Sequence, residues 1–127
     1  MHHVALLGYG YWGINLLRNL INSPEIDKIT VCDIQMHRLD LVQKNNSSIF
    51  ITTDYQEVLK NPEIDIVVIA TPTSSHYELA KEALSHHKHT LVEKPLCTCS
   101  KQAEELYQLA DINKKILFTD LTFLYNG

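Results

Sequence analysis

Apolar residues form two kinds of pattern along this chain, short unbroken runs and longer stretches with helical spacing. Short unbroken runs are typical of buried β-strands. They predict strands over residues 4–7, 29–32, 49–51, 64–70, 90–92 and 116–118. Between the runs, helical spacing of apolar residues and end signals such as Pro and Asp predict helices over residues 12–21, 36–43, 55–60, 76–85 and 100–112.

The regular alternation of strand and helix predicts the fold class. With short connections it is typical of an α/β fold, a doubly wound and mostly parallel sheet, here of six strands. Residues 66–69 are apolar on both faces, as a central strand covered by helices must be. We expect one domain over residues 1–120. Residues 121–127 are expected to begin a connection to a further domain.

The end of the chain is rich in apolar and aromatic residues. Phe123, Leu124 and Tyr125 stand just before the last two residues. A complete domain seldom finishes on such a surface, so the chain is expected to be cut from a longer protein. The isolated chain is expected to self-associate, or to leave this tail disordered.

Composition narrows the classes of partner. The chain has 127 residues, 45% of them apolar, and a formal net charge of −4 without a cluster of Lys and Arg. Nucleic acid and anionic membrane surfaces are bound through concentrated positive charge, so neither is expected as a partner. No apolar run approaches the ~18 residues of a membrane span, and no signal-peptide pattern is evident, so we expect a cytoplasmic protein.

Cysteine and histidine spacing gives no metal site. Cys32, Cys97 and Cys99 match neither a CxxC redox motif nor a zinc spacing, which favours reduced structural thiols. A histidine cluster, His86, His87 and His89, has no acidic or thiol partner beside it. It is expected to form a solvated turn, and no metal is predicted.

Three of the four glycines lie in one short motif, Gly8-x-Gly10-x-x-Gly13, between the first predicted strand and the first predicted helix. In this position the first glycine permits a tight turn, the second lets the backbone approach a ligand, and the third lets the helix pack on the strand. Free N–H groups at the helix start then favour a pyrophosphate. The motif predicts a dinucleotide site, and the alternative is a tight turn without a ligand.

An acidic residue supports the dinucleotide interpretation. Asp33 ends the second predicted strand, 20 residues after Gly13, where a carboxylate accepts hydrogen bonds from the adenosine ribose. A 2′-phosphate at ~4 Å from it would cost roughly 1 kcal/mol in water and ~4 kcal/mol at a partly buried site. We therefore predict NAD rather than NADP. Arg38 could offset this repulsion, but its place on a predicted helix favours a solvated side chain.

Further candidate residues follow two later strands, at the carboxyl ends where open α/β sheets bind ligands. They are Thr71, Pro72, Thr73 and His76 after residues 64–70, and Glu93, Lys94 and Pro95 after residues 90–92. Hydroxyls and a carboxylate suit the nicotinamide ribose, and a lysine suits the site of hydride transfer. The alternatives are a helix-capping role for His76 and a surface ion pair for Glu93 and Lys94.

With these motifs in this order, the chain resembles the Gfo/Idh/MocA family of oxidoreductases. The resemblance rests on "GYGYWG", Asp33, "ATPTSSHYELA" and "VEKPL". It extends over all 127 residues, but only over the N-terminal NAD-binding Rossmann half of the family. The segments "GYGYWGINLLRNL" and "LTFLYNG" resemble members that act on nucleotide sugars in surface-polysaccharide synthesis.

The resemblance implies a role for each motif residue. Gly8, Gly10, Tyr11, Trp12 and Gly13 would hold the pyrophosphate, and Asp33 the adenosine ribose, although Trp12 could equally be a packing residue. Thr71, Pro72, Thr73 and His76 would border the cofactor, Glu93 would approach the nicotinamide ribose, and Lys94 would be the catalytic lysine. Lys94–Pro95 would be a cis peptide bond.

The chain departs from the family in two ways. It lacks the C-terminal, mostly antiparallel domain, which in the family supplies the Asp and His of the substrate site and most of the oligomer interface. Asp120 and Leu121 stand where many relatives of the subgroup have Gly-His. A lysine alone cannot supply the matched acid and base of alcohol oxidation, so the isolated chain is expected to be inactive.

The sequence leaves two alternative functions open. The first is the NAD-binding part of a homo-oligomeric dehydrogenase that acts on the CH–OH group of a sugar, sugar nucleotide or cyclitol. The second is a non-catalytic module or subunit that binds NAD(H). An S-adenosylmethionine-dependent methyltransferase would share the glycine motif and Asp33, but it would give no reason for the sequence Glu93-Lys94-Pro95.

Overall fold

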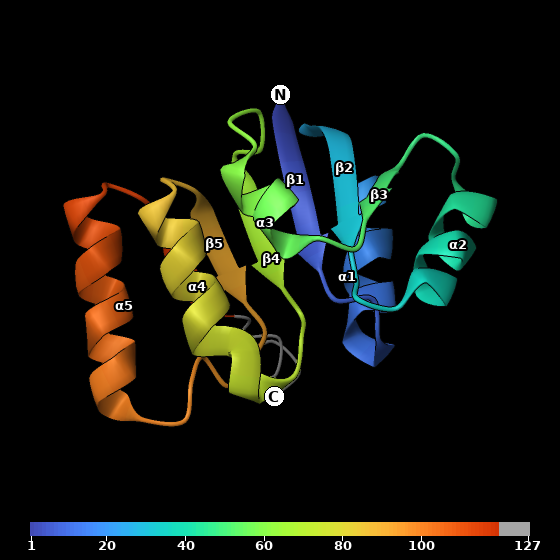
Figure 1. The fold of residues 1–127 in the computed structure, drawn as a ribbon. Coiled ribbons are helices and arrows are strands. Elements are labelled where there is room, and N and C mark those ends of the chain that lie inside the picture. The colour runs from blue at the N-terminus through green and yellow to red at the C-terminus, as the bar shows by residue number, and fades with distance from the viewer. Residues whose placement is uncertain (120–127) are drawn as a thin grey trace, which may run out of the picture.

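A computed structural model describes residues 1–119 of the chain as strands alternating with helices (Figure 1). The strands are β1 His2–Leu7, β2 Ile26–Cys32, β3 Phe50–Thr52, β4 Ile66–Ile69, β5 His89–Val92 and β6 Leu117–Thr119. The helices are α1 Tyr11–Ile21, α2 Met36–Asn45, α3 Tyr55–Lys60, α4 His76–Ser85 and α5 Ser100–Ile112. A single 3₁₀ turn, η1 Thr73–Ser75, precedes α4.

The six strands form one parallel sheet in the order β3-β2-β1-β4-β5-β6. From β1 the chain builds outward to β3, then returns to the centre and builds outward again from β4 to β6. The point of return lies between β1 and β4, the place where ligands bind in open α/β sheets. The predicted fold class is confirmed.

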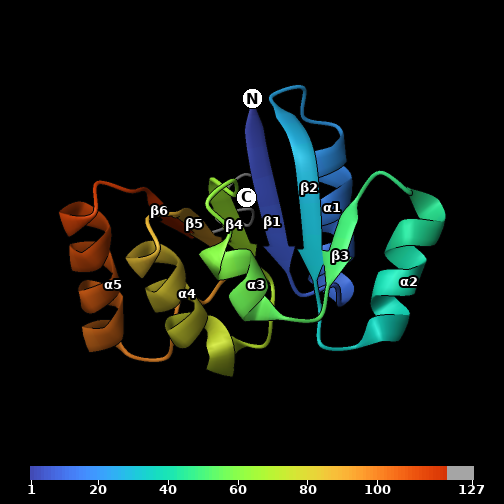
Figure 2. The ribbon, with the colours of Figure 1, turned by 45° about the horizontal axis from the view of Figure 1, so that its top comes forward.

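Helices cover both faces of the sheet (Figure 2). One buried core joins α1 and α2 to one face of β1, β2 and β4, through residues such as Leu6, Leu17 and Leu39. A second core joins α3, α4 and α5 to the opposite face, through residues such as Leu7, Leu84 and Leu106. Because successive strand residues point to opposite faces, the unbroken apolar run in β1 serves both cores.

Most predicted boundaries lie within two residues of those in the structure, and β2 differs most. It begins at Ile26, three residues before the predicted strand, because its first part carries the exposed polar residues Asp27 and Lys28. At the other end of the sheet, β6 ends at Thr119. The predicted connection over 121–127 and the tail at Phe123, Leu124 and Tyr125 lie outside the described residues.

Local signals account for the shorter elements. Asp54 stands at the N-cap of α3, and its Oδ1 accepts a hydrogen bond of 2.9 Å from the backbone N–H of Gln56. Such a cap satisfies one of the free N–H groups at a helix start.

Within residues 1–119, none of the helices is both long enough and apolar enough to cross a membrane.

Candidate cofactor site

The ends of the four central strands bring the candidate residues to one edge of the sheet. The register pairs Leu7 of β1 with Cys32 of β2 and with Ile69 of β4, and it pairs Ile69 with Val92 of β5. Neighbouring strands lie about 4.8 Å apart, so these four ends span roughly 14 Å. The glycine motif, Asp33, the loop after β4 and the loop after β5 therefore leave the sheet side by side.

The first glycine makes the turn out of β1. Gly8 has φ +99°, a conformation that residues with a Cβ rarely adopt. Its N–H donates to the carbonyl of Cys32 at 2.7 Å, and a Cβ here would lie 2.7 Å from the carbonyl oxygen of Ala70. Only glycine fits where β1 meets the start of the loop after β4.

The other two glycines have different surroundings. A Cβ on Gly13 would overlap the carbonyl oxygen of Gly8, so this glycine lets α1 pack against the turn. Gly10 stands at the N-cap of α1 with φ −88°, and a Cβ there would meet only the Arg38 guanidinium, at 3.8 Å. The space above Gly10 is therefore open, as backbone binding of a pyrophosphate at a helix N-terminus requires.

Two aromatic side chains stand at the start of α1. Tyr11 is 77% exposed and Trp12 is 54% exposed, and their rings meet edge to face with centroids 5.2 Å apart. Neither ring belongs to the buried core. The predicted contact of these two residues with the cofactor stays a prediction.

Asp33 is buried and held in one orientation. It is 2% exposed. Its Oδ2 accepts from the backbone N–H of Tyr9 at 2.8 Å, and its Oδ1 accepts from that of Gln35 at 2.8 Å. The carboxylate thus ties the glycine loop to the start of α2. Burial, helped by Asp33, raises the pKa of the neighbouring Cys32 thiol to about 12, so this thiol stays protonated.

Arg38 belongs to the same cluster. From the position of Arg38 on a helix we expect a solvated side chain, but in the structure this side chain contacts Asp33. The Nη1 atom of Arg38 lies 3.2 Å from Oδ2 of Asp33 and donates a hydrogen bond to it. The long side chain reaches back across the first turn of α2, which helical spacing does not reveal. The pair places a positive charge beside the Asp33 carboxylate.

His76 links the loops that follow β4 and β5. It is the first residue of α4 and is 1% exposed. Its Nε2 lies 2.7 Å from the carbonyl oxygen of Thr71, and its Nδ1 lies 2.7 Å from that of Pro95. Its side chain does not cap α4. Both of its neighbours are acceptors, and a neutral ring has one N–H, so both contacts are hydrogen bonds only when the ring carries two protons.

The loop after β5 begins at the same edge. The N–H of Glu93 donates to the carbonyl of Ile69 at 2.9 Å, and Glu93 is 8% exposed. Lys94 and Pro95 are exposed, and the peptide bond between them is cis, as the resemblance implies. On the neighbouring loop, Thr71 and Thr73 are half-buried and Pro72 is exposed. Cofactor contacts of these residues stay predictions.

Taken together, the sheet order, the three glycines and the fixed acidic residue define a dinucleotide-binding Rossmann domain. The profile of the GFO_IDH_MocA family, described as an oxidoreductase family with an NAD-binding Rossmann fold, matches residues 2–121. The chain belongs to this Gfo/Idh/MocA family.

Relatives come from several organisms. The uncharacterized oxidoreductase sll0816 of Synechocystis is 30% identical over 122 residues, covering 96% of this chain and 33% of that protein. The scyllo-inositol 2-dehydrogenase (NADP(+)) IolW of Bacillus subtilis is 27% identical, covering 85% of this chain and 30% of that protein. The crystal structure of GenD2 from gentamicin A biosynthesis, in complex with NAD, superposes with a TM-score of 0.88 at 26% identity, covering 93% of this chain and 34% of that one.

Two facts about these relatives bear on function. The chain spans about a third of the length of the proteins it matches. One relative is named for NADP(+) and another was solved with NAD, so the family binds NAD(P) and membership alone does not choose between the two.

Proposed function

We propose that this chain is the cofactor-binding part of a dehydrogenase that transfers a hydride between NAD(H) and the CH–OH group of a sugar, sugar nucleotide or cyclitol. The observation that carries the proposal is the common edge formed by the ends of β2, β1, β4 and β5. A dinucleotide lying across this edge would have its adenosine at Asp33 and its nicotinamide beside Glu93 and Lys94. When bound, the nicotinamide ring supplies the hydride acceptor.

The residues of this chain would bind and orient. The N–H groups at the start of α1, above the open face of Gly10, would hold the pyrophosphate. Lys94 is exposed in the loop after β5, the last of these four strand ends. There its ammonium would hydrogen-bond a substrate oxygen and assist movement of the hydroxyl proton. His76 would keep Lys94 and Pro95 in place by holding the carbonyl of Pro95. Further acid and base groups would come from the remaining part of a longer protein.

The proposed preference is for NAD. The buried Asp33 carboxylate is fixed by two backbone N–H groups, so it cannot turn away from a 2′-phosphate. Arg38 neutralises part of this charge. We therefore expect a moderate preference, about five- to tenfold, rather than exclusion of NADP, since a charge pair at ~4 Å is worth about 1 kcal/mol in water.

The only tryptophan provides the test. Trp12 is more than half exposed beside the glycine loop, so its emission should be quenched when a reduced dinucleotide binds. The chain is titrated with NADH and separately with NADPH. Tighter binding of NADH supports the Asp33 assignment, and equal binding contradicts it while leaving the fold intact. Asp33→Asn, which keeps an oxygen acceptor but removes the charge, should bring the two affinities within about twofold of each other.

The substrate and assembly are proposals of the same kind. A polyhydroxylated substrate is suggested by the IolW relative, which is named for an inositol. The complete protein is proposed to be a homo-oligomer with neither nucleic acid nor membrane as partner. Assay of the full reading frame with NAD and a panel of sugars, sugar nucleotides and inositols tests the reaction. If Lys94→Met abolishes turnover and leaves the NADH dissociation constant unchanged, the role of Lys94 in chemistry is supported.

A further inference from the structure

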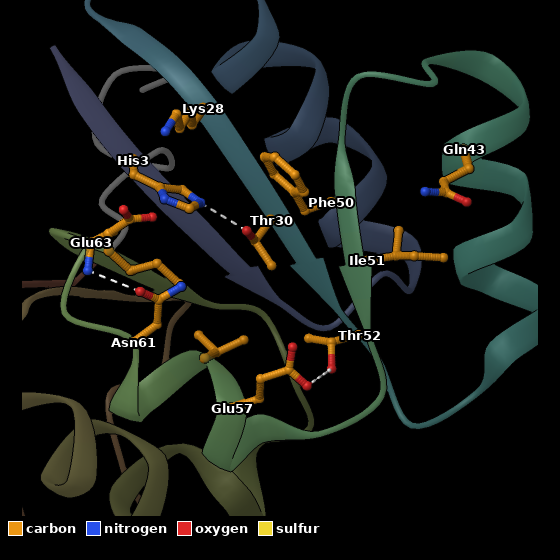
Figure 3. Close-up of a pocket in the computed structure, with 12 residues that line it drawn as sticks. His3, Lys28, Thr30, Gln43, Phe50, Ile51, Thr52, Glu57, Asn61 and Glu63 are labelled. Carbon is orange, nitrogen blue, oxygen red and sulfur yellow. Dashed lines mark hydrogen bonds between the residues drawn. The ribbon is translucent and has the colours of Figure 1, made fainter.

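A concave region away from the proposed cofactor site lies on the sheet face that carries α3 (Figure 3). Its volume is about 340 Å³. Nε2 of His3 lies 2.8 Å from Oγ1 of Thr30, and Oγ1 of Thr52 donates a hydrogen bond of 3.0 Å to Oε2 of Glu57. Several polar groups of this wall are thus already bonded to one another. A pair of reactive side chains lies elsewhere, in the loop between β5 and α5.

The reactive pair consists of two of the three cysteines, Cys97 and Cys99. Cys99 is exposed and Cys97 is half-buried, whereas Cys32 is fully buried at the end of β2. Burial raises the pKa of the Cys32 thiol to about 12, so this thiol is unreactive in the folded chain. Only the two loop cysteines are accessible to a reagent, and the expectation of a structural thiol describes Cys32 alone.

The thiol of Cys97 points toward Cys99. Its Sγ donates a hydrogen bond of 3.2 Å to the carbonyl oxygen of Cys99. The Cα atoms of the two cysteines lie at most about 7 Å apart even in a fully extended chain, and the chain bends at Thr98 between them. Disulfides join Cα atoms about 4.4–6.8 Å apart. The two cysteines can therefore be bridged by a small adjustment of an exposed loop.

The Cys99 side chain does not hold the start of α5. Cys99 stands at the N-cap of this helix, and its side chain makes no capping hydrogen bond. Its backbone carbonyl accepts a hydrogen bond of 3.2 Å from the N–H of Ala103. Because the backbone alone begins the helix, the chemistry of the sulfur can change without loss of a cap. An accessible cysteine next to a second one is the arrangement typical of redox sensors.

The loop that carries the pair is short and is fixed at both ends. The carbonyl of Pro95 lies 2.7 Å from Nδ1 of His76, and Cys99 is fixed at the start of α5. Only residues 96–98 separate these two points. A covalent bond between the two sulfurs tightens this segment, so it draws on the position of Lys94 and Pro95 or on the first turn of α5.

We propose that Cys97 and Cys99 form a reversible disulfide that regulates the site around Lys94; the regulatory part rests on the function proposed above. The oxidant is a disulfide of low molecular weight. The thiolate of Cys99 attacks one of its sulfurs, releases one thiol and forms a mixed disulfide. Cys97 then attacks the Cys99 sulfur and releases the second thiol. Two electrons pass from the cysteines to the oxidant, and the two cysteine protons end on the two released thiols.

Oxidised glutathione tests the formation of this bond. The reduced full chain is incubated with it at pH 8, where an ordinary cysteine thiol is partly ionised. The reaction is quenched with acid, and the chain is unfolded, alkylated and measured by mass spectrometry. We expect the number of alkylated thiols to fall from three to one, with no glutathione retained. The tryptic peptide 89–101, which contains both loop cysteines, should be lighter than its thiol form by two hydrogen atoms.

Cys97→Ser is the matched control, because it should retain one glutathione on Cys99 in place of the internal bond. Three results with the wild-type chain would overturn the proposal: a retained glutathione, a disulfide between two chains, or no reaction.

NADH binding and amide hydrogen exchange test the regulation. Trp12 emission should report NADH binding at least about threefold weaker in the oxidised chain than in the reduced chain. Amide exchange at residues 93–97 should change with oxidation. Glutathione treatment should alter neither quantity in the double variant Cys97→Ser/Cys99→Ser. A disulfide that forms and leaves both quantities unchanged would refute regulation. If neither form binds NADH, the proposed function fails, and exchange at residues 93–97 still decides whether the bond moves the loop.

Discussion

Asp33 acts with its neighbours rather than alone. A carboxylate has about four acceptor positions. Here the backbone N–H groups of Tyr9 and Gln35 and the guanidinium of Arg38 fill three of them. Two ribose hydroxyls need two acceptor positions, so Arg38 has to move aside or share its oxygen when an adenosine binds. If the proposed adenosine site is correct, we expect this competition to set how strictly the two cofactors are distinguished.

Removing Arg38 should sharpen the preference for NADH. In Arg38→Ala the carboxylate of Asp33 loses its cationic partner, so a 2′-phosphate meets an uncompensated charge. We expect the affinity ratio of NADH to NADPH to rise about fivefold or more, as loss of one charge pair at ~4 Å implies. Trp12 quenching measures both affinities. Lys44→Ala, which removes a positive charge from the far end of α2, is the control; an equal change in both variants would argue against a specific role of the pair.

Substitution of two glycines of the motif should have different effects, one on stability and the other on cofactor binding. A Cβ at Gly13 overlaps the carbonyl of Gly8, whereas a Cβ at Gly10 enters open space. Gly13→Ala should lower the free energy of unfolding by about 1–3 kcal/mol, as overpacking usually does. Gly10→Ala should keep the melting temperature within a few degrees and weaken NADH binding tenfold or more. Thermal denaturation and Trp12 titration of both variants check this, and a stable Gly13→Ala protein would refute it.

At the scale of secondary structure, His76 joins the loop after β4 to the loop after β5. The sheet places these two loops side by side, but the hydrogen bonds between its strands do not extend into them. Replacing it by Leu leaves the carbonyls of Thr71 and Pro95 without this donor. A hydrogen bond of this kind is worth about 0.5–1.5 kcal/mol, and both carbonyls lie where solvent can partly replace it, so His76→Leu should destabilise the fold by roughly 1 kcal/mol. It should also speed hydrogen exchange at residues 93–97. His86→Leu, at the exposed end of α4, is the control, and unchanged exchange in His76→Leu would contradict the linking role.

The elements followed from sequence because each depends on local pattern. The central strands are apolar on both faces, and the helices show their buried stripe and end signals, as Asp54 does for α3. The glycine motif and Asp33 could be found for the same reason, through fixed spacing. Contacts that long side chains make with distant parts of the chain could not be predicted in this way. Arg38 and His76 act through atoms far from their own backbone, on partners that only the packed sheet brings near.

At the scale of the whole molecule, both edge strands of the sheet expose an aromatic side chain, Phe50 of β3 at 55% and Phe118 of β6 at 44%. On the β6 side, Ile112, Ile116 and Phe118 are 75%, 64% and 44% exposed. An edge strand with exposed apolar side chains is prone to pair with another chain. We therefore expect this chain to self-associate as its concentration rises, in line with the proposal of an oligomeric complete protein.

Sedimentation velocity over a range of concentrations measures this association. Ile116→Lys should shift the population toward monomer, because a charge on the edge opposes pairing. Leu41→Lys, at an exposed apolar position of α2, should leave the distribution unchanged. A wild-type chain that stays monomeric at all concentrations would count against association through this edge.

The central position of β1 has a consequence for how the protein is made. β1 leaves the ribosome before the other five strands of the sheet, yet one of its two neighbours, β4, ends at Ile69, 62 positions after Leu7. At about 5–20 residues per second, the nascent chain waits roughly 3–12 s before its sheet can close. During that interval β2 is the only neighbouring strand of β1, and the other edge of this apolar strand stays unpaired. Slow translation over residues 8–65 should thus raise the demand for chaperones.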